Sequence, residues 1–561
     1  MNQPVPANRI TDLLWIVTWG VASSLWCLTA SSQLGATFDE PFYLAQGLEF
    51  WHSGSHAMLL RKGTMPLPAD LQTLPLHLWE RWQGARFNPT DDLEHLLPIA
   101  RAGTLVFWWV LLLYAWRAGN ELAGPWAGRV AVAWIALEPN FLAHASLATT
   151  DIAITACLMA LLYHFRIGRQ AGWTRRIGVP ALWLTAAMLS KASALLFAPV
   201  GLLMVELDRL MRSQTVIIPP GIPTVRALLS QLKPFRRDVM HIFLLALCLT
   251  FLYCGSDWQQ NSRFVAWAHG LPDGPVSRTL SWVSEHLRIF SNAGNGLGYQ
   301  VTHNLKGHGA YLLGESHPRA VWYYFPVLLT IKLSLSWILM PILVAVVRPG
   351  ALVNWASLSG GTLLALSPAF RVQIGIRMIL PLLALIAVGL SAAIVQAAGA
   401  PIPRWKRQVV ATGAAACLLW TSWSSFTVWP HGLCFVNSVW KAKPSYLLES
   451  SCDWGQGLKE LERWRKEQRL SEVSVWYYGT DPSLRRTGLR ELPLHELSAG
   501  GHGEVAPRVE GKHLAVSTSL LYGPIMPRDH QAVVYLRSQS PIARTTTFLI
   551  FDFTGKKGGS A

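Results

Sequence analysis

Charged residues are scarce in this 561-residue chain. Asp, Glu, Lys and Arg make up 14% of it, and hydrophobic residues make up 51%. Soluble domains carry about 25% charged residues, so this balance excludes an ordinary soluble protein. Apolar runs of about 17–25 residues, the length that crosses hydrocarbon, recur along the first three quarters of the chain. The composition therefore predicts a polytopic α-helical membrane protein.

Several signatures of other protein classes are also missing. No Cys/His spacing resembles a zinc site, and we find no internal repeat. The net charge is +16, but the basic residues are not gathered into one domain, so we exclude a nucleic-acid-binding protein. Of the seven Cys, Cys434 and Cys452 lie in the part that we expect to be exported, where a disulfide would survive. The sequence leaves their pairing open.

The apolar runs predict about eleven transmembrane helices. We place them at 12–32, 96–116, 125–143, 151–166, 178–190, 193–208, 239–256, 321–347, 351–366, 374–398 and 409–428. Arginine and lysine are concentrated in alternate loops, around residues 166–176, 209–237 and 404–407. Because basic loops stay in the cytoplasm, this pattern indicates an inner-membrane protein with the other loops outside.

The predicted topology divides the chain into two parts. Residues 1–429 form a transmembrane module with two large extracytoplasmic loops, 33–95 and 257–320. Residues 430–561 turn polar and contain one helix-like and two strand-like segments, GLKELERWRKEQ, SEVSVWYYG and TTFLIFDF. We expect a small extracytoplasmic α/β domain here, with a disordered tail at GKKGGSA.

Two adjacent carboxylates, Asp39 and Glu40, follow the first apolar run in TFDEPFYLAQG. Pro41 suits the first turn of a helix, and Leu44, Leu48 and Trp51 would then form one apolar stripe, as in an interfacial helix. The pair could simply cap that helix. Alternatively, one carboxylate is catalytic and the other supports it, because adjacent helical positions point about 100° apart.

A second polar stretch, LAHASLATTD, falls on the same predicted face. His144 and Asp151 flank it. Thr149 or Thr150 could cap the next helix, with Asp151 favouring its N-terminus. The same residues could also line a polar cleft beneath Asp39. These two interpretations are compatible.

Four cations lie in or near predicted spans. Arg101, Lys191 and Arg377 are expected near outer helix ends, whereas Lys332 is expected about ten residues inside its span. Charges at depth are costly and usually face protein, water or a partner. Snorkelling to the interface would explain Arg101 and Lys191 equally well. Several cations near one membrane face would also suit a phosphate carried by a lipid.

Taken together, these stretches resemble the bacterial branch of the family 39 glycosyltransferases. This family includes protein O-mannosyltransferases, is similar to the aminoarabinose transferases of lipid A, and has the GT-C membrane architecture. The matching stretches run in order along the chain: FDEPFYLAQGLEFWHSG, ELAGPWAGRVAVAWIALEPNFLAHASLATTDIAI, LSKASALLFAP, YLLGESHPRAVWYYFPVLLTIKLSLSW, IGIRMILPLL, HGLCFVN, SCDWGQGLKELERW and YYGTDPS.

The resemblance implies transfer of a sugar, with inversion, from a polyprenyl-phosphate donor to an acceptor on the outer face. It implies that Asp39 is the catalytic carboxylate. Glu40 and Asp151 would support it, and Asp151 and His144 would also line the substrate cleft. Candidates to bind the donor phosphate are Arg101, Lys191, Arg377 and Lys332. The acceptor would be a protein, lipid A or another glycan. The scheme requires no cofactor and no metal, although the carboxylates and His144 leave room for a divalent ion.

The sequence departs from the family at two places. Relatives carry a His/Glu-Pro-Pro-Leu segment where this chain reads GTMPLPADLQTLPL, and they more often have Asn or Leu before the Asp of CDWGQ. Two other functions stay open at this point. One is a transporter or flippase for lipid-linked sugars, and the other is a non-catalytic glycolipid-binding assembly factor.

Overall fold

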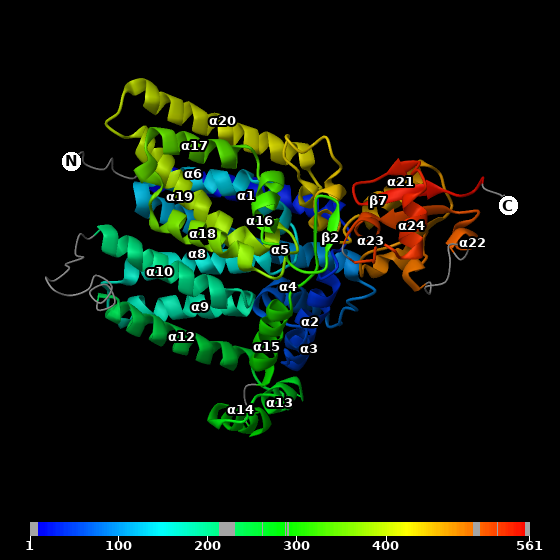
Figure 1. Ribbon diagram of the computed structural model, residues 1–561, viewed down its shortest axis with the longest axis horizontal. Coiled ribbons are helices and arrows are strands. Elements are labelled where there is room, and N and C mark those ends of the chain that lie inside the picture. The colour runs from blue at the N-terminus through cyan, green and yellow to red at the C-terminus, as the bar shows by residue number, and fades with distance from the viewer. Residues whose placement is uncertain are drawn as a thin grey trace.

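The computed structural model describes residues 9–212, 231–260, 262–286, 288, 291–496, 505–523 and 525–555. The tail after Gly555, for which we expected disorder, lies outside these residues. Within them the chain forms a bundle of apolar helices, from one end of which a small sheet with its own helices projects (Figure 1). The first described residue is at the far end of that bundle.

Six of the described helices are long and apolar enough to cross a membrane, which makes this a multi-pass membrane protein. They are α1 (Arg9–Gln33), α5 (Leu93–Ala123), α8 (Asp151–Gly168), α12 (Lys233–Cys254), α19 (Leu380–Ala398) and α20 (Arg404–Val428). Further apolar helices complete the bundle: α6 (Pro125–Leu137), α7 (Pro139–Ala145), α9 (Val179–Ser190), α10 (Ala194–Arg212), α16 (Tyr324–Lys332), α17 (Ser336–Val347) and α18 (Trp355–Leu366).

Helices occupy all eleven predicted spans, but two of the spans are broken. Pro139 starts a new helix after α6, and Glu138 caps it by accepting hydrogen bonds from the next two N–H groups. Helices α16 and α17 meet at an angle of 101°, and only as a bent pair would they count as a seventh span. Helices of 12 residues, such as α9 and α18, are only about 18 Å long. The higher span count therefore stays a prediction.

The bend between α16 and α17 corrects the predicted position of Lys332. This residue ends α16, so it does not lie inside a continuous span. The side chain of Asn437 donates hydrogen bonds to the carbonyls of Thr330 and Leu333 (2.5 and 2.9 Å), and its N–H donates to Ile331. Asn437 thus satisfies backbone groups that the break leaves without helical partners.

The loops on the sheet side of the bundle are mostly helical. They contain α2 (Glu40–Ser53), α3 (Ala57–Arg61), α4 (Leu67–Gln83), α13 (Ser262–His269), α14 (Pro275–His286), α15 (Ser291–Lys306) and a hairpin of β1 (Ala310–Leu312) and β2 (Glu315–His317). In α2, Leu44 and Leu48 of the predicted apolar stripe face the protein interior, and Trp51 is partly buried. Leu44 and Leu48 are buried in one cluster with Leu76 of α4 and Leu96 of α5.

The C-terminal part is built on a five-stranded sheet with the order β4-β3-β5-β7-β6. Strand β3 is parallel to β4 and β5, and β7 is antiparallel to β5 and β6. The strands are β3 (Val473–Trp476), β4 (Leu489–Glu491), β5 (His513–Ser517), β6 (Ala543–Arg544) and β7 (Phe548–Asp552); the helices are α21 (Leu458–Glu467), α22 (Val505–Val509), α23 (Thr518–Leu521) and α24 (Gln531–Arg537). The helix and both strands expected from the sequence are present.

Ion pairs tie the basic loops together at the end of the bundle opposite the sheet (Figure 1). Arg169, just after α8, pairs with Glu206 of α10 at 2.8 Å and with Asp238 of α12 at 2.5 Å. Arg129 of α6 pairs with Asp12 of α1 at 2.8 Å. The two ends of the bundle therefore differ: basic loops occupy one, and α2–α4 with the sheet occupy the other.

Candidate active site

Asp39 immediately precedes α2, in a segment that is hydrogen-bonded to the C-terminal part of the chain. The N–H groups of Gly35 and Phe38 donate to the carbonyls of Gln456 and Trp454 (both 2.8 Å), and that of Ala36 donates to the carboxylate of Asp481 (2.9 Å). Three hydrogen bonds within four residues fix the backbone that leads into Asp39. The C-terminal part thus helps to position this carboxylate.

The side chain of Asp39 does not cap α2, although the residue occupies the N-cap position. Its carboxylate instead lies 3.6 Å from Nη1 of Arg377, and about a third of the side chain (32%) is exposed. Capping is the structural explanation that the sequence left open. Since no capping hydrogen bond forms, the carboxylate remains available to a substrate.

Arg377 is held between Asp39 and an aromatic ring. Its guanidinium lies over the indole of Trp454, 3.9 Å from the ring centroid, an arrangement that fixes the plane of the cation. Gly375, two residues earlier, has φ +95°, and a Cβ there would lie 2.5 Å from Cβ of Ser451. Only glycine fits this turn, which directs Arg377 toward Asp39.

A second ion pair lies beside the first. Nζ of Lys191 donates to the carboxylate of Asp151 at 2.7 Å and lies 3.8 Å from the sulfur of Met378, the neighbour of Arg377. Nδ1 of His144 lies 3.7 Å from the other oxygen of Asp151. We call Asp39, Arg377, Trp454, Asp151 and Lys191 the Asp39 cluster. Its two carboxylates each face a cation, so fixed side-chain charge neutralises the cluster.

Burial raises the pKa of Asp39 above its ordinary value of 3.8, and the nearby Asp151 carboxylate acts in the same direction. Arg377 and Lys191 oppose the shift without cancelling it. Asp39 therefore holds a proton more readily than a solvated aspartate does. A higher pKa makes a carboxylate a stronger base once it is ionised.

Glu40 and Arg101 bind each other instead of joining this cluster. Glu40 is fully buried and accepts five hydrogen bonds, two from Arg101 (2.8 and 2.7 Å), two from Thr37 and one from Ala148. Although burial opposes the charge, Arg101 and these N–H donors hold the pKa of Glu40 below its ordinary value. A carboxylate offers about four lone-pair directions, so none is left for a substrate.

The remaining hydrogen bonds of Arg101 go to backbone carbonyls of Ser31, Leu34 and Gly35. The Glu40–Arg101 pair therefore joins the end of α1, the start of α2, α5 and the turn before α8. This contradicts our expectation that Glu40 supports the base directly and that Arg101 faces a lipid phosphate. Both residues instead connect the helices and turns that position Asp39.

Lys332 is also separated from the Asp39 cluster. Its side chain is 1% exposed, and its amine lies 2.8 Å from the carboxylate of Glu449 and donates to the carbonyl of Leu433 at 2.6 Å. This pair ties the α16–α17 bend to the segment that follows α20. The sequence did not point to Glu449, which lies in the unremarkable stretch YLLES.

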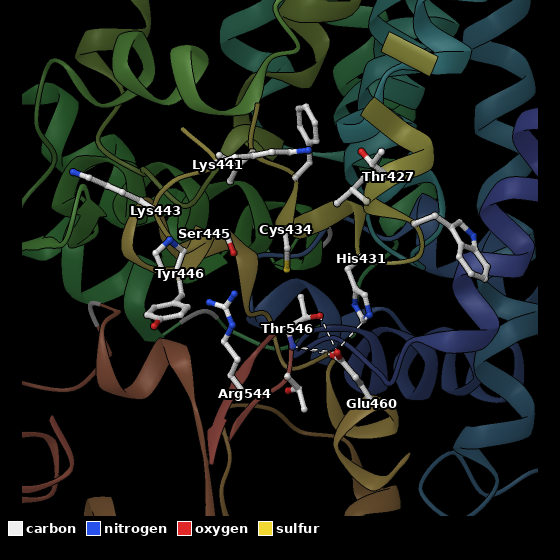
Figure 2. Close-up of a pocket in the computed structure, with 16 residues that line it drawn as sticks. Thr427, His431, Cys434, Lys441, Lys443, Ser445, Tyr446, Glu460, Arg544 and Thr546 are labelled. Carbon is white, nitrogen blue, oxygen red and sulfur yellow. Dashed lines mark hydrogen bonds and ion pairs between the residues drawn. The ribbon is translucent and has the colours of Figure 1, made fainter. Parts of the chain in front are cut away.

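A cavity of about 520 Å³ lies elsewhere, between the end of α20 and the edge of the sheet. Lys441, Lys443 and Arg544 line it, and Figure 2 shows Arg544 pointing toward Ser445. Glu460 forms another wall, where it accepts hydrogen bonds from Thr546. None of the Asp39 cluster lines this cavity. In the described part of the chain, no carboxylate lies within ion-pair distance of these three cations.

The two cysteines whose pairing the sequence left open lie side by side under this cavity. All seven cysteines are free thiols. The sulfur of Cys434 donates to the carbonyl of Cys452 at 2.9 Å, and both residues are buried. The structure thus brings the two cysteines together without a disulfide between them.

Residues 98–219 match the family model described as dolichyl-phosphate-mannose-protein mannosyltransferase. The resemblance inferred from the sequence is therefore confirmed over this segment. It contains Arg101, His144, Asp151 and Lys191, and it contains neither Asp39 nor Arg377. No curated protein matches the chain.

Two solved membrane proteins are similar to the chain as a whole. One is ArnT from Cupriavidus metallidurans bound to undecaprenyl phosphate, with 13% identity, a TM-score of 0.46, and coverage of 96% of this chain and 97% of that one. The other is the archaeal oligosaccharyltransferase AglB from Archaeoglobus fulgidus in complex with an inhibitory peptide and a dolichol-phosphate, with 11% identity, a TM-score of 0.45, and coverage of 90% and 70%.

Proposed function

We propose that this chain is an inverting membrane glycosyltransferase that moves a sugar from a polyprenyl-phosphate donor to an acceptor outside the inner membrane. The observation that carries the proposal is the Asp39 cluster. In it the carboxylate of Asp39, which does not cap α2, faces Arg377, and Lys191 lies close to the neighbouring Met378. The family match over residues 98–219 supports the same reaction class. In this scheme, residues 1–429 form the transmembrane catalytic module, and residues 430–561 form an extracytoplasmic domain.

In the proposed reaction Asp39 removes the proton from an acceptor hydroxyl or amine. The freed electron pair attacks the anomeric carbon from the side opposite the lipid phosphate, and the bond from that carbon to the phosphate oxygen breaks. The bonding electrons leave with the phosphate, so a second negative charge develops there. Arg377 and Lys191 lie where fixed positive charge would stabilise it.

The other cluster residues would position these groups. Trp454 holds the guanidinium of Arg377 in plane, and Asp151 holds the amine of Lys191. His144 would support Asp151 from its other oxygen. Arg377 and Lys191 are partly exposed, so a donor phosphate can reach them, whereas Arg101 and Lys332 are fully buried.

The distribution of charge supports the proposed orientation. The basic loops gather at the end of the bundle opposite the Asp39 cluster, and such loops stay in the cytoplasm. The cluster and the sheet would then be extracytoplasmic, where a lipid-linked donor rather than a nucleotide sugar is the accessible substrate.

The cavity beside α20 bears on the acceptor. Lys441, Lys443 and Arg544 favour an acceptor that carries an anionic group, such as lipid A, over a neutral glycan or an uncharged protein segment. Mass spectrometry of envelope glycolipids and glycoproteins, with and without the gene, would identify the acceptor. A sugar missing from one molecular species would identify both substrates.

Product analysis separates this proposal from its rivals. Purified protein incubated with a polyprenyl-phosphate sugar and an envelope extract should release free polyprenyl phosphate and sugar-modified acceptor in equal amounts. A flippase would move the lipid across a vesicle membrane without releasing phosphate, and a glycolipid-binding factor would only retain it. Either of these results would overturn the proposed reaction.

A further inference from the structure

Two histidines and a glutamate converge between α2 and α4, away from the Asp39 cluster. His52 lies near the end of α2, while His77 and Glu80 lie one turn apart on α4 and so share a face of that helix. One donor atom from each residue lies within 4.8 Å of the other two. His52 is thirteen residues along α2 from Asp39, or about 20 Å at the helical rise.

The donor atoms of this group lie close together, and two of its three residues, His77 and Glu80, are buried. Nε2 of His52 lies 2.6 Å from Oε2 of Glu80, and Nδ1 of His77 lies 3.5 Å from the same oxygen. The side chains of His77 and Glu80 are only 10% and 4% exposed. Nδ1 of His77 is buried and makes no hydrogen bond, which is costly for a polar atom unless something binds it.

Neighbouring residues fix the orientation of these ligands. The other oxygen of Glu80 accepts a hydrogen bond from the N–H of Phe87 at 2.9 Å, which leaves Oε2 for the group. The ring of Trp51 stacks on His77 with centroids 5.5 Å apart. Such outer contacts orient metal ligands and fix their rotamers.

We propose that His52, His77 and Glu80 bind a divalent transition-metal ion of the zinc class. Two imidazole nitrogens and one carboxylate oxygen are a donor set that zinc takes, with a fourth position left for water. Ligand atoms of a tetrahedral zinc ion lie roughly 3.4 Å apart, given metal–ligand distances of about 2.1 Å. Nδ1 of His77 already lies at about that distance from Oε2 of Glu80, whereas Nε2 of His52 lies closer to that oxygen and would have to move away from it.

Such an ion would join α2 to α4 at the end of α2 farthest from Asp39. Its role would be to hold the helix that Asp39 precedes, and it would take no part in the transfer reaction. The site therefore does not depend on the proposed function. It also differs from the ion that the sequence left room for, which would have involved Asp39, Glu40 and His144.

The experiment uses the full chain purified in detergent, stripped with a chelator and dialysed against buffered zinc. Elemental analysis should find one zinc per chain, and zinc should raise the thermal unfolding temperature. His77→Gln and His52→Asn should each lose at least tenfold in zinc affinity and lose the thermal shift. Size-exclusion chromatography shows which variants fold, and either variant alone is sufficient for the test.

The matched control is His269→Gln. His269 pairs with Glu285 at 2.6 Å, the same distance as His52 and Glu80, and His286 lies 4.0 Å from the other oxygen of Glu285. These three side chains are exposed, and their donor atoms do not converge into a group that could hold a metal ion. This variant should keep its zinc. The proposal is overturned if the wild type binds no zinc, or if His77→Gln and His52→Asn bind as much as it does. In that case the three residues form only a hydrogen-bonded group.

Discussion

The carboxylate of Asp39 lies 3.6 Å from the guanidinium of Arg377, a residue from the opposite end of the membrane module in sequence. Trp454, from the C-terminal part, covers the other side of that guanidinium. Three distant segments thus meet at one acid. This arrangement leads to predictions that separate a reacting carboxylate from a structural one.

Replacing Arg377 should affect both the reaction and the titration of Asp39. Arg377→Gln removes a charge that stabilises the leaving phosphate, and loss of one such donor costs about 10²–10³-fold in kcat. It also removes a cation that lowers the pKa of Asp39, so that pKa should rise further. Because a base works only when unprotonated, the acid limb of the pH–rate profile should move to higher pH.

Arg371→Gln is the control for this variant. Arg371 lies on the same segment, is exposed, and donates to the carbonyl of Leu305. It should leave both the rate and the acid limb unchanged. If the acid limb of the pH–rate profile lies at the same pH in Arg377→Gln as in the wild type, Arg377 does not act on the catalytic base.

Replacing Glu40 tests whether it is structural or catalytic. Glu40→Gln leaves the buried Arg101 without its charge partner, which costs about 3–5 kcal/mol in stability. The thermal unfolding temperature should therefore fall by several degrees, and Arg101→Met together with Glu40→Gln should recover part of the loss. An unchanged unfolding temperature with a hundredfold lower kcat would instead restore the catalytic role that the sequence implied.

Asp453 should make stability depend on pH. Burial raises the pKa of Asp453 from 3.8 to about 6, against hydrogen bonds from Ser519 and Gly455. The folded state therefore binds more protons than the unfolded state between these values, and stability falls as pH rises through them. The difference corresponds to on the order of 3 kcal/mol.

The measurement compares unfolding temperatures of the wild type and Asp453→Asn from pH 4 to 7. The variant cannot titrate at this position, so the other groups cancel in the difference. The wild type should lose stability relative to the variant as pH rises. A difference that is constant with pH would mean that Asp453 is charged throughout this range.

Local patterns were enough to predict the helices and the most informative residues. Apolar runs located every helix of the bundle because burial in lipid requires such runs, and the resemblance singled out Asp39, Lys191 and Arg377. The break at Pro139 had a local signal as well, since a residue before proline avoids helical backbone. The bend after Lys332 had none, because it depends on Asn437, about a hundred residues later.

Partners were harder to predict than positions. Lys332 was recognised as a buried charge, but its partner Glu449 lies in another segment with no distinctive pattern. Arg101 and Glu40 were both predicted to be functional from the sequence. Only the folded structure shows that they pair with each other and so are not available to a substrate. The sequence did not point to His52, His77 and Glu80, because they lie on two different helices. Their side chains come together only when these helices pack against each other.

The most direct test of the central claim is the rate of sugar transfer by Asp39→Asn, with Glu49→Gln as its control. Glu49 is an exposed acid on the helix that Asp39 precedes, so its loss changes the charge without touching the cluster. If Asp39 is the base, Asp39→Asn should lose about 10²–10⁴-fold in kcat at normal expression while Glu49→Gln keeps the wild-type rate. Transfer by Asp39→Asn at close to the wild-type rate would contradict the account.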